Sequence, residues 1–271
     1  MTGVIINNNE YQVSTGGTKI EYSSMGGGTI GYSMYGENIP EVPEDKLLEW
    51  INIPQNIETY YGGDGLIYAD TDYYHNSEHY LEFYCCPILG PNYAKAYKDS
   101  ITFWMHKPVD YNFDRTDMDL NLNRTGSTLG KNNLIIGQAN SSNHSTYTNI
   151  YNVKANTITY GQWYKIGCYQ NKIVINDNLY VGKTSGTYKS IINDSTLRLF
   201  SYGANNEGFE GKFSYLDIYK DNTKANLLHS YKPFLTPENE IIIKDVVTNK
   251  RFSFYRNSES GDMQYITYQI A

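Results

Sequence analysis

The stretch "GQWYKIGCYQNKIVINDNLYVG", residues 161–182, decides the fold class. It is rich in Tyr, Ile and Val, and two short polar pairs interrupt it, Gln170–Asn171 and Asp177–Asn178. Because Asn and Asp tolerate the positive φ that two-residue hairpin turns require, each pair predicts a reversal between neighbouring strands. The stretch therefore predicts a three-stranded antiparallel meander.

Segments of the same type recur from residue 57 onward. In "HYLEFYCC", residues 79–86, odd-numbered and even-numbered residues lie on opposite sides, and the period-2 pattern is typical of a strand with one buried face. Connections this short leave no room for crossover helices, which predicts an all-β fold, an antiparallel β-sandwich or jelly roll. The further predicted strands span residues 100–106, 133–138, 146–153, 156–160, 162–170, 172–177, 179–182, 195–202, 212–221, 239–246, 250–256 and 263–270.

The composition agrees with strands joined by polar turns. The chain has 271 residues, of which 28 are Tyr, 23 are Gly and only 3 are Trp, a mixture that favours pleated strands over packed helices. The formal net charge is −7, and the 22 Lys and Arg residues are scattered. Without a basic patch, nucleic acid is not an expected partner.

Two further features concern the place of synthesis and the redox state. No apolar run approaches the roughly 18 residues that span a bilayer, so no membrane insertion is expected. The first residues, "MTGVIINNNEYQVS", contain neither a basic nor an apolar signal region, which predicts cytoplasmic synthesis.

The chain has three cysteines, Cys85, Cys86 and Cys168. They do not form a disulfide framework and are predicted to be buried thiols.

Residues 1–54 differ from the rest of the chain. They contain short β-prone pieces separated by Gly and Asn, and then a short helix signal from Pro43 to Trp50. Such a segment buries too little surface to fold alone. We therefore predict an attachment or oligomerisation segment at residues 1–54 and a β-sandwich domain at residues 55–271. A flexible leader is the alternative interpretation of the first segment.

The meander resembles that of laminin-G-like modules, which have a concanavalin A-like jelly-roll fold. In that family a W-x-x-I/V strand precedes two short strands joined by an I-N-D/N-G-like turn, and here Trp163, Ile166 and "VINDN" at 174–178 match it. A second block of the family is similar to "FEGKFSYLDIY" at 209–219. The order and separation of the two blocks also agree.

The C-terminal part is similar to the end of laminin-G-like modules in bacteriophage virion proteins. There an I-Y strand leads to a hydrophobic-Pro segment and then to the pattern h-h-D-x-h-T/N-x-K-x-F/Y. The resemblance implies a virion structural protein, a fibre or capsid-decoration component, whose N-terminal segment binds other virion proteins. Since the chain lacks the long shaft of a tail fibre, head and tail locations both stay open. The matching positions are Ile218, Tyr219, Pro233, Asp245, Val247, Asn249, Lys250 and Phe252.

Catalytic patterns are not found. Jelly-roll glycoside hydrolases use two carboxylates, and retaining members carry a Glu-x-Asp-x-x-Glu-like set on one strand. The nearest carboxylate runs, at 114–119 and 238–245, do not have this spacing. The five histidines are dispersed, with no Ser or Cys paired to them as in a catalytic triad. The sequence therefore predicts no enzymatic activity and no catalytic residues.

Oxygen donors gather in "DYNFDRTDMDLNLNRTG", residues 110–126. Calcium takes roughly six to eight oxygen ligands from such segments, and the resemblance implies calcium at a loop edge. Asp114, Asp117 and Asp119 are the candidate ligands, and calcium is the one cofactor considered. Because the EF-hand order is missing, a solvated loop without metal is the alternative.

Tyr rings can stack on sugar faces while Asn side chains bind sugar hydroxyls. The alternative is that these rings fill the sandwich or the contacts between subunits, where an amphipathic ring is useful. The candidate ligand-binding residues are Tyr73, Tyr74, Tyr202, Asn205 and Asn206.

Two hypotheses of different classes follow. The first is a bacteriophage protein on the virion surface, made in the host cytoplasm, that adheres to host or mucosal glycans as a homo-oligomer, with a trimer favoured over a dimer. The second is a free carbohydrate-binding module or glycoside hydrolase of the same fold. Removal of residues 1–50 separates them, because it abolishes particle incorporation under the first and leaves sugar binding intact under the second.

Overall fold

The computed structural model contains two units, Met1–Glu44 and Asp45–Ala271, each compact in itself. In the smaller unit, strand β1 (Thr2–Ile6) pairs antiparallel with strand β2 (Asn9–Val13). The structure describes residues 2–6, 9–13, 44–53, 67–88, 100–106, 116–123, 134–140, 147–152, 158–170, 172–181, 192–200, 209–256 and 266–271.

The larger unit is built from strands, and every pairing in it is antiparallel, which confirms the all-β fold class. The described residues contain no helix, and so none that is long and apolar enough to cross a membrane. The strands are β3 (Lys46–Ile53), β4 (Ile67–Asn76), β5 (Tyr80–Pro87), β6 (Ser100–His106), β7 (Thr116–Asn123), β8 (Leu134–Asn140), β9 (Tyr147–Asn152), β10 (Tyr164–Tyr169), β11 (Lys172–Ile175), β12 (Asn178–Val181), β13 (Ile192–Leu199), β14 (Gly211–Tyr219), β15 (Leu227–Leu235), β16 (Ile241–Asp245), β17 (Lys250–Arg256) and β18 (Thr267–Ile270).

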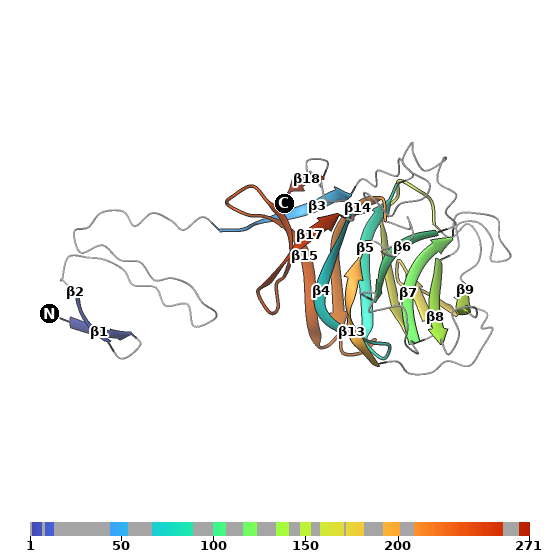
Figure 1. Cartoon of the computed structure of the whole chain (residues 1–271), viewed down its shortest axis with the longest axis horizontal. Coiled ribbons are helices and arrows are strands. Elements are labelled where there is room, and N and C mark those ends of the chain that lie inside the picture. The colour runs from blue at the N-terminus through green and yellow to red at the C-terminus, as the bar shows by residue number, and fades with distance from the viewer. Residues whose placement is uncertain are drawn as a thin grey trace. The chain divides into compact units, whose positions relative to one another are not determined.

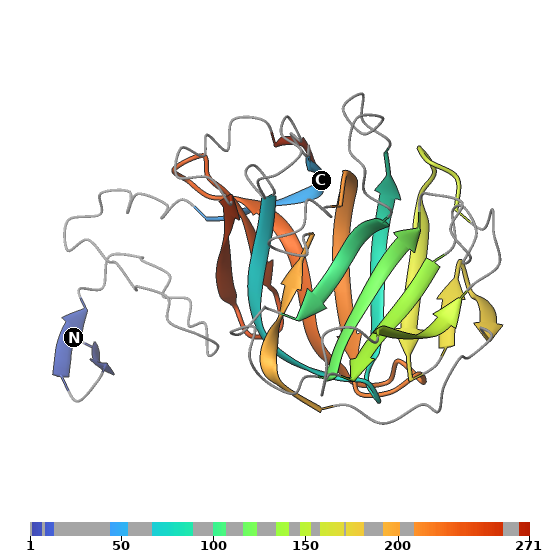
Figure 2. The same ribbon diagram turned by 45° about the vertical axis from the view of Figure 1, so that its right-hand side comes forward.

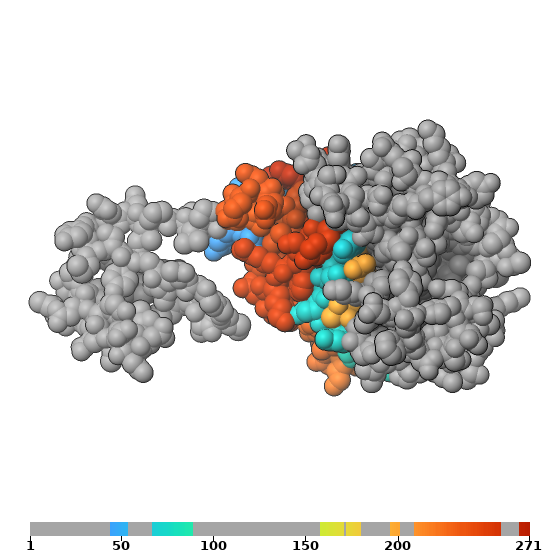
Figure 3. Space-filling view, viewed as in Figure 1, coloured from blue at the N-terminus to red at the C-terminus, as the bar shows by residue number. Residues whose placement is uncertain are grey.

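The strands form two layers joined through β17. One layer has the order β12-β11-β10-β5-β14-β3-β15-β16-β17, with β18 beside β3, and the other continues from β17 through β4, β13, β6, β7 and β8 to β9. The strands β6 to β8 cross in front of the first layer (Figures 1 and 2), so the sheet folds back on itself as a sandwich. On the face seen in Figure 3, the C-terminal strands (orange to red) lie directly beside residues 67–88 (cyan), where β17 pairs with β4.

The core between the layers is aromatic. Phe83 of β5 and Phe213 of β14 contact Phe200, which follows β13, with ring centroids 6.1 and 4.9 Å apart. Phe254 of β17 stacks on Phe200 at 6.0 Å, and Phe209 packs against Phe83 at 5.8 Å. Such ring pairs each contribute roughly 0.5–1.5 kcal/mol beyond the burial of their area. The cluster therefore ties the two layers together.

The predicted helix from Pro43 to Trp50 is wrong, because residues 46–53 form strand β3. Leu48 and Ile51 are buried in the core, and β3 pairs with β14, β15 and β18. These tertiary contacts outweigh the local helix preference of a short Lys-Leu-Leu-Glu run. Since β3 belongs to the sandwich, the division between the two units falls before the predicted boundary at residue 54.

Two other parts of the strand prediction also change. Residues 158–160 form no strand, so the strand expected at 156–160 is wrong there; residues 156 and 157 lie outside the described ranges. The patterns did not indicate β15, which contains Pro233 opposite Ile243 of β16. Proline lacks the N–H of a sheet ladder and normally argues against a strand between two neighbours.

The meander is confirmed as β10, β11 and β12. For the first turn, Tyr169 and Lys172 pair directly, as the predicted reversal requires, and Gln170 has a positive φ of 47°; Asn171 lies outside the described residues. The second turn lies at Asn176–Asp177 rather than at Asp177–Asn178, because Asn178 is already paired with Ile175. Both turn residues have positive φ, 47° and 66°, the geometry of a type I′ hairpin turn.

The prediction that β5 buries one face is incomplete. Leu81 and Phe83 lie in the core, but Tyr80 and Glu82 on the other side are also buried, with 3% and 6% of their surface exposed. The side of β5 that faces away from the core is therefore covered by other side chains.

The three cysteines are buried and none forms a disulfide, as predicted. Burial raises the pKa of the Cys85 and Cys86 thiols, so both stay protonated at neutral pH.

Candidate functional site

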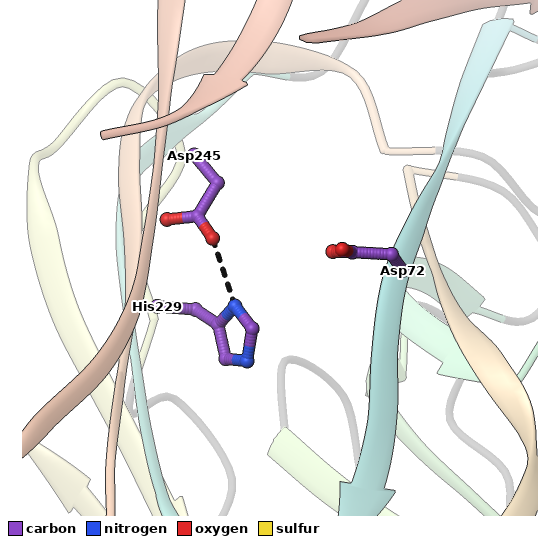
Figure 4. A group of neighbouring side chains, drawn as sticks. All are labelled: Asp72, His229 and Asp245. Carbon is purple, nitrogen blue, oxygen red and sulfur yellow. Dashed lines mark hydrogen bonds and ion pairs between the residues drawn. The ribbon is translucent and has the colours of Figure 1, made fainter. Parts of the chain in front are cut away.

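A polar cluster lies where the first layer passes into the second. Asp72 of β4, His229 of β15 and Asp245 of β16 each offer one oxygen or nitrogen atom, and these atoms lie within 4.8 Å of one another. Figure 4 shows the Asp72 carboxylate pointing from β4 toward His229 and Asp245. We call these three residues the corner cluster.

Asp245 is fully buried and accepts four hydrogen bonds. His229 Nδ1 lies 2.8 Å from its Oδ2, the Thr248 hydroxyl donates at 2.7 Å, and the amides of Ser230 and Val247 donate at 2.9 and 3.1 Å. Burial by itself raises the pKa of Asp245, but the hydrogen bonds, that of His229 foremost, outweigh it and lower the pKa to about 2. The ionised carboxylate thereby closes the turn between β16 and β17.

Asp72 is held by two donors. The Tyr231 hydroxyl donates to its Oδ1 at 3.1 Å, and Lys250 Nζ lies 2.5 Å from its Oδ2. Burial, followed by the charges of Asp72 and Asp245, raises the pKa of Tyr231, so its phenol stays a donor. The same hydroxyl lies 3.3 Å from His229 Nδ1, and the two rings stack at 5.6 Å.

A second histidine lies beside the cluster. The Tyr73 hydroxyl lies 2.9 Å from His79 Nδ1 and accepts a hydrogen bond from the Asn76 amide, while the Tyr73 ring meets the His229 ring edge to face at 5.3 Å. Burial, and then the charge of His229, lowers the pKa of His79. His79 is therefore neutral at physiological pH.

Two carboxylates and an imidazole are a donor set that suits zinc and similar divalent cations. In the corner cluster, however, the carboxylate oxygens already have partners. Lys250 and Tyr231 bind Asp72, and four donors bind Asp245. Within the described part of the chain, no Ser, Thr or Cys hydrogen-bonds to His229, so a nucleophile–histidine–aspartate triad is not formed there. The cluster acts as a polar joint between β4, β15, β16 and β17.

A second polar group surrounds Glu82 on the side of β5 away from the core. Tyr215 donates to Glu82 Oε1 at 3.2 Å, Tyr80 donates to Oε2 at 3.5 Å, and Lys224 Nζ pairs with the same Oε2. The buried charge is thus matched by one ammonium group and two phenols, as buried carboxylates require.

Asp217 of β14 lies directly opposite Glu82. It accepts hydrogen bonds from the Ser230 hydroxyl at 2.6 Å and from the Tyr219 hydroxyl at 3.3 Å. Burial raises the pKa of Asp217, the Ser230 hydrogen bond opposes this effect, and the Glu82 charge adds to it. Burial and then Asp217 and Glu82 raise the pKa of Tyr219 to about 12, which keeps the phenol protonated.

Six aromatic rings lie around the two carboxylates in two rows. Neighbouring ring centroids are 4.9 and 5.3 Å apart in the first row, and 5.6 and 6.3 Å apart in the second. All the rings except Tyr80 are partly exposed. The rows, together named the outer aromatic face, are Trp163, Tyr84 and Tyr215, then Tyr169, Tyr80 and Tyr219.

Gly167 of β10 makes room for Tyr80. A Cβ atom at Gly167 would lie 2.0 Å from the Tyr80 hydroxyl oxygen and 2.4 Å from its Cζ. The ring therefore lies over the backbone of the neighbouring strand, and Lys224 Nζ sits 4.8 Å from the ring centroid. A glycine is required here by close approach and not by its backbone angle.

The predicted saccharide ligands are only partly placed. Tyr73 is 4% exposed and its hydroxyl is bonded inside the fold, whereas Tyr74 is 57% exposed on the opposite side of β4. Tyr202, Asn205 and Asn206 lie outside the described residues. Saccharide binding by this set stays a prediction.

The predicted calcium ligands do not lie in a loop throughout. Asp117 and Asp119 are on strand β7, opposite Ala139 and Gly137 of β8, while Asp114 lies outside the described residues. The expected loop is wrong for residues 116–123, because β7 pairs with both β6 and β8. Calcium binding there stays a prediction.

Sequence reasoning missed both polar groups. Asp245 and Lys250 are positions of the phage-like motif, but nothing in the sequence indicates that they meet Asp72 from a distant strand. Glu82 and Asp217 are likewise far apart in the chain and become neighbours only through strand pairing. The available signal was the polar residue between two tyrosines in "YLEFY" and "YLDIY".

The protein is thus an antiparallel β-sandwich that contains the hydrogen-bonded corner cluster and, around Glu82 and Asp217, the outer aromatic face. No family model matches the chain, and no curated protein matches it. Among solved structures, the chain is similar to a native heptameric SAP-like pentraxin from Limulus polyphemus, with 9% sequence identity and a TM-score of 0.39. The match covers 74% of this chain and 96% of the pentraxin chain. A likeness at this level says nothing about activity or partners.

Proposed function

We propose that this chain is a structural protein of a bacteriophage virion, displayed on the particle surface, where its sandwich adheres to glycans without enzymatic activity. The proposal takes its virion part from the resemblance of residues 216–258 to phage modules. That segment contains the end of β14 and the strands β15 to β17, which contribute to the core and to the corner cluster.

The observation that carries the proposal is the division of the chain. Residues 1–44 form one compact unit, and residues 45–271 form another with its own core. A protein that is anchored at one end and presents a binding domain needs two such units, one to bind other virion proteins and one to bind the ligand. We further propose a homo-oligomer, with a trimer before a dimer.

Particle incorporation tests the virion role. An antibody against the sandwich should label virions purified from a culture that produces the full chain, as seen by immunogold microscopy. A variant that begins at Asp45 keeps β3 and the core, so it should fold, but it should no longer label the particles. Labelling of particles by the shortened chain, or absence of the full chain from them, contradicts the proposal. Sedimentation of the full chain measures the oligomer.

A glycoside hydrolase is the second candidate, and one observation favours it. Glu82 and Asp217 are directly opposed on neighbouring strands, and retaining glycosidases hold two carboxylates roughly 5–5.5 Å apart. Against it, Glu82 is 6% exposed and paired with Lys224. Release of reducing ends from a glycan bound by the wild type, lost in Glu82→Gln, would favour the hydrolase over the adhesive protein.

A further inference from the structure

Lysines gather around the outer aromatic face, although the whole chain has a net charge of −7. Lys165 of β10 is exposed and lies opposite Tyr84. Lys172 Nζ lies 5.0 Å from the centroid of the Tyr169 ring. Lys212 of β14 lies opposite Cys86 on the neighbouring strand, and its Nζ lies 4.0 Å from the centroid of the Trp50 ring.

The three lysines outnumber the carboxylates that oppose them. Glu82 is neutralised by Lys224, whereas Asp217, bonded to the neutral hydroxyls of Ser230 and Tyr219, keeps its charge, and Asp177 acts on Tyr80. Within the described part of the chain, the three lysines named above form no ion pair with a carboxylate. A ligand on this face therefore meets ammonium groups whose charge is not yet matched.

Three of the six rings on this face are held by hydrogen bonds to carboxylates before any ligand binds. Glu82 accepts hydrogen bonds from the hydroxyls of Tyr80 and Tyr215, and Asp217 accepts one from the hydroxyl of Tyr219. Fixed side chains lose little rotamer entropy on binding, which favours recognition by a small number of contacts. The exposed parts of the rings lie near ammonium groups, as the Tyr169 ring does with Lys172.

We propose that the outer aromatic face binds an acidic saccharide, with the Trp163, Tyr84 and Tyr215 rings packing against sugar C–H groups and Lys165 and its neighbours pairing with the carboxylate or sulfate groups. This inference rests on the glycan-adhesive part of the proposed function. A neutral glycan would leave the ammonium groups unmatched. A second copy of the chain is a poorer occupant, because lysines are depleted in protein–protein interfaces.

The first experiment is a binding assay of the full chain on an array that carries carboxylated and sulfated saccharides beside neutral ones. Signals concentrated on the acidic saccharides, weakened by added NaCl, are expected, since partly exposed charge pairs are screened by salt. For the strongest carboxylated saccharide, its methyl-esterified form provides a neutral version of the same backbone and should bind at least tenfold more weakly. Signals on neutral saccharides alone, or none on acidic ones, overturn the proposal.

Variants then locate the binding surface. Trp163→Ala, at a position outside the strands, should weaken binding to the best acidic saccharide by about tenfold or more, as loss of a stacked ring does. Lys165→Gln should weaken it about threefold and reduce its salt dependence. Tyr255→Ala and Lys46→Gln, exposed positions on β17 and β3, are matched controls and should bind like the wild type.

The outcomes separate this inference from the virion role. If Trp163→Ala and Lys165→Gln bind like the wild type while melting at its temperature, the ligand lies elsewhere and the proposed face is wrong. If Trp163→Ala instead dissociates the oligomer in sedimentation, the face is a contact between copies and the proposal also fails. In both cases the virion role is still supported if the antibody labels virions that were made with the full chain and does not label those made with the chain that begins at Asp45.

Discussion

The two sides of strand β5 carry aromatic rings of different chemistry. Toward the core lies Phe83, surrounded by Phe200, Phe209 and Phe213 at centroid distances of 4.9 to 6.1 Å. Away from the core lie Tyr80 and Tyr84, and the Tyr80 hydroxyl donates a hydrogen bond to Glu82.

The difference teaches how this chain uses its many tyrosines. A buried hydroxyl without a partner costs free energy, so a ring in the sealed core is best a phenylalanine. On the outer side, Glu82 and Asp217 accept the hydroxyls, and a half-buried tyrosine becomes favourable. The core ring therefore stabilises by burial alone, and the outer ring by burial together with a hydrogen bond.

The largest expected effect separates the two sides directly. Phe213→Ala should lower the free energy of unfolding by about 4 kcal/mol, because it removes a fully buried ring and leaves a cavity. Tyr215→Ala, two residues along the same strand, should cost about 2 kcal/mol, since its ring is only partly buried. Urea unfolding followed by tryptophan fluorescence measures both. Equal losses would mean that the outer side is packed as tightly as the core.

The corner cluster adds a fully buried carboxylate to the comparison. The pKa of Asp245 is about 2 in the folded chain against an ordinary 3.8, so its stabilising effect is fully present above pH 4 and is lost as the pH falls through 2. The loss should be about 2 kcal/mol. Asp245→Asn should be less stable than the wild type at pH 7, and the difference should shrink between pH 4 and pH 2. A constant difference over that range contradicts the assignment.

A smaller effect is expected from the contact between Gly167 and Tyr80. Gly167→Ala places a methyl group where the Tyr80 ring lies, and should cost about 1–2 kcal/mol as the ring is displaced. In the Tyr80→Ala background the same change should cost little. A double-mutant cycle measures the coupling, which should exceed about 1 kcal/mol. Additive losses would show that Gly167 is needed for another reason.

The smallest effects concern single hydroxyl groups of the outer side. Tyr215→Phe should cost about 1 kcal/mol, because its hydroxyl lies 3.2 Å from Glu82. Tyr80→Phe should cost about 0.5 kcal/mol, since its hydroxyl lies at the longer distance of 3.5 Å and Lys224 remains paired with Glu82. Thermal unfolding of both variants beside the wild type gives the order. The reverse order would make Tyr80 the main donor to Glu82.

Local patterns predicted the parts of the fold that depend on near neighbours. The meander at residues 164–181 is confirmed because the alternation and the Asn-rich turns act over a few residues. β3 was predicted as a helix and β15 was not predicted at all, because their pairing partners lie far away in the chain. Neither the Lys-Leu-Leu-Glu run of β3 nor the sequence around Pro233 of β15 indicates which strands they pair with.

The candidate site was still less accessible to sequence reasoning. Tyr73 and Tyr74 were chosen as a pair, yet neighbouring residues of a strand point to opposite sides, and only Tyr74 is exposed. The search for a glycosidase-like carboxylate set considered spacing along single strands, whereas Glu82 and Asp217 form a pair across two strands. Spacing along the chain does not report which strands lie side by side.

The amino-acid sequence by itself determined that this protein is made of antiparallel strands, since the period-2 alternation and the turn residues act within each hairpin. It also determined that the three cysteines are buried thiols. Only the tertiary structure decided that Asp72, His229 and Asp245 meet, and that Glu82 and Asp217 lie opposite each other among six aromatic rings. The physical reason is that strand order and register depend on how distant apolar faces pack together, which is a property of the whole sandwich.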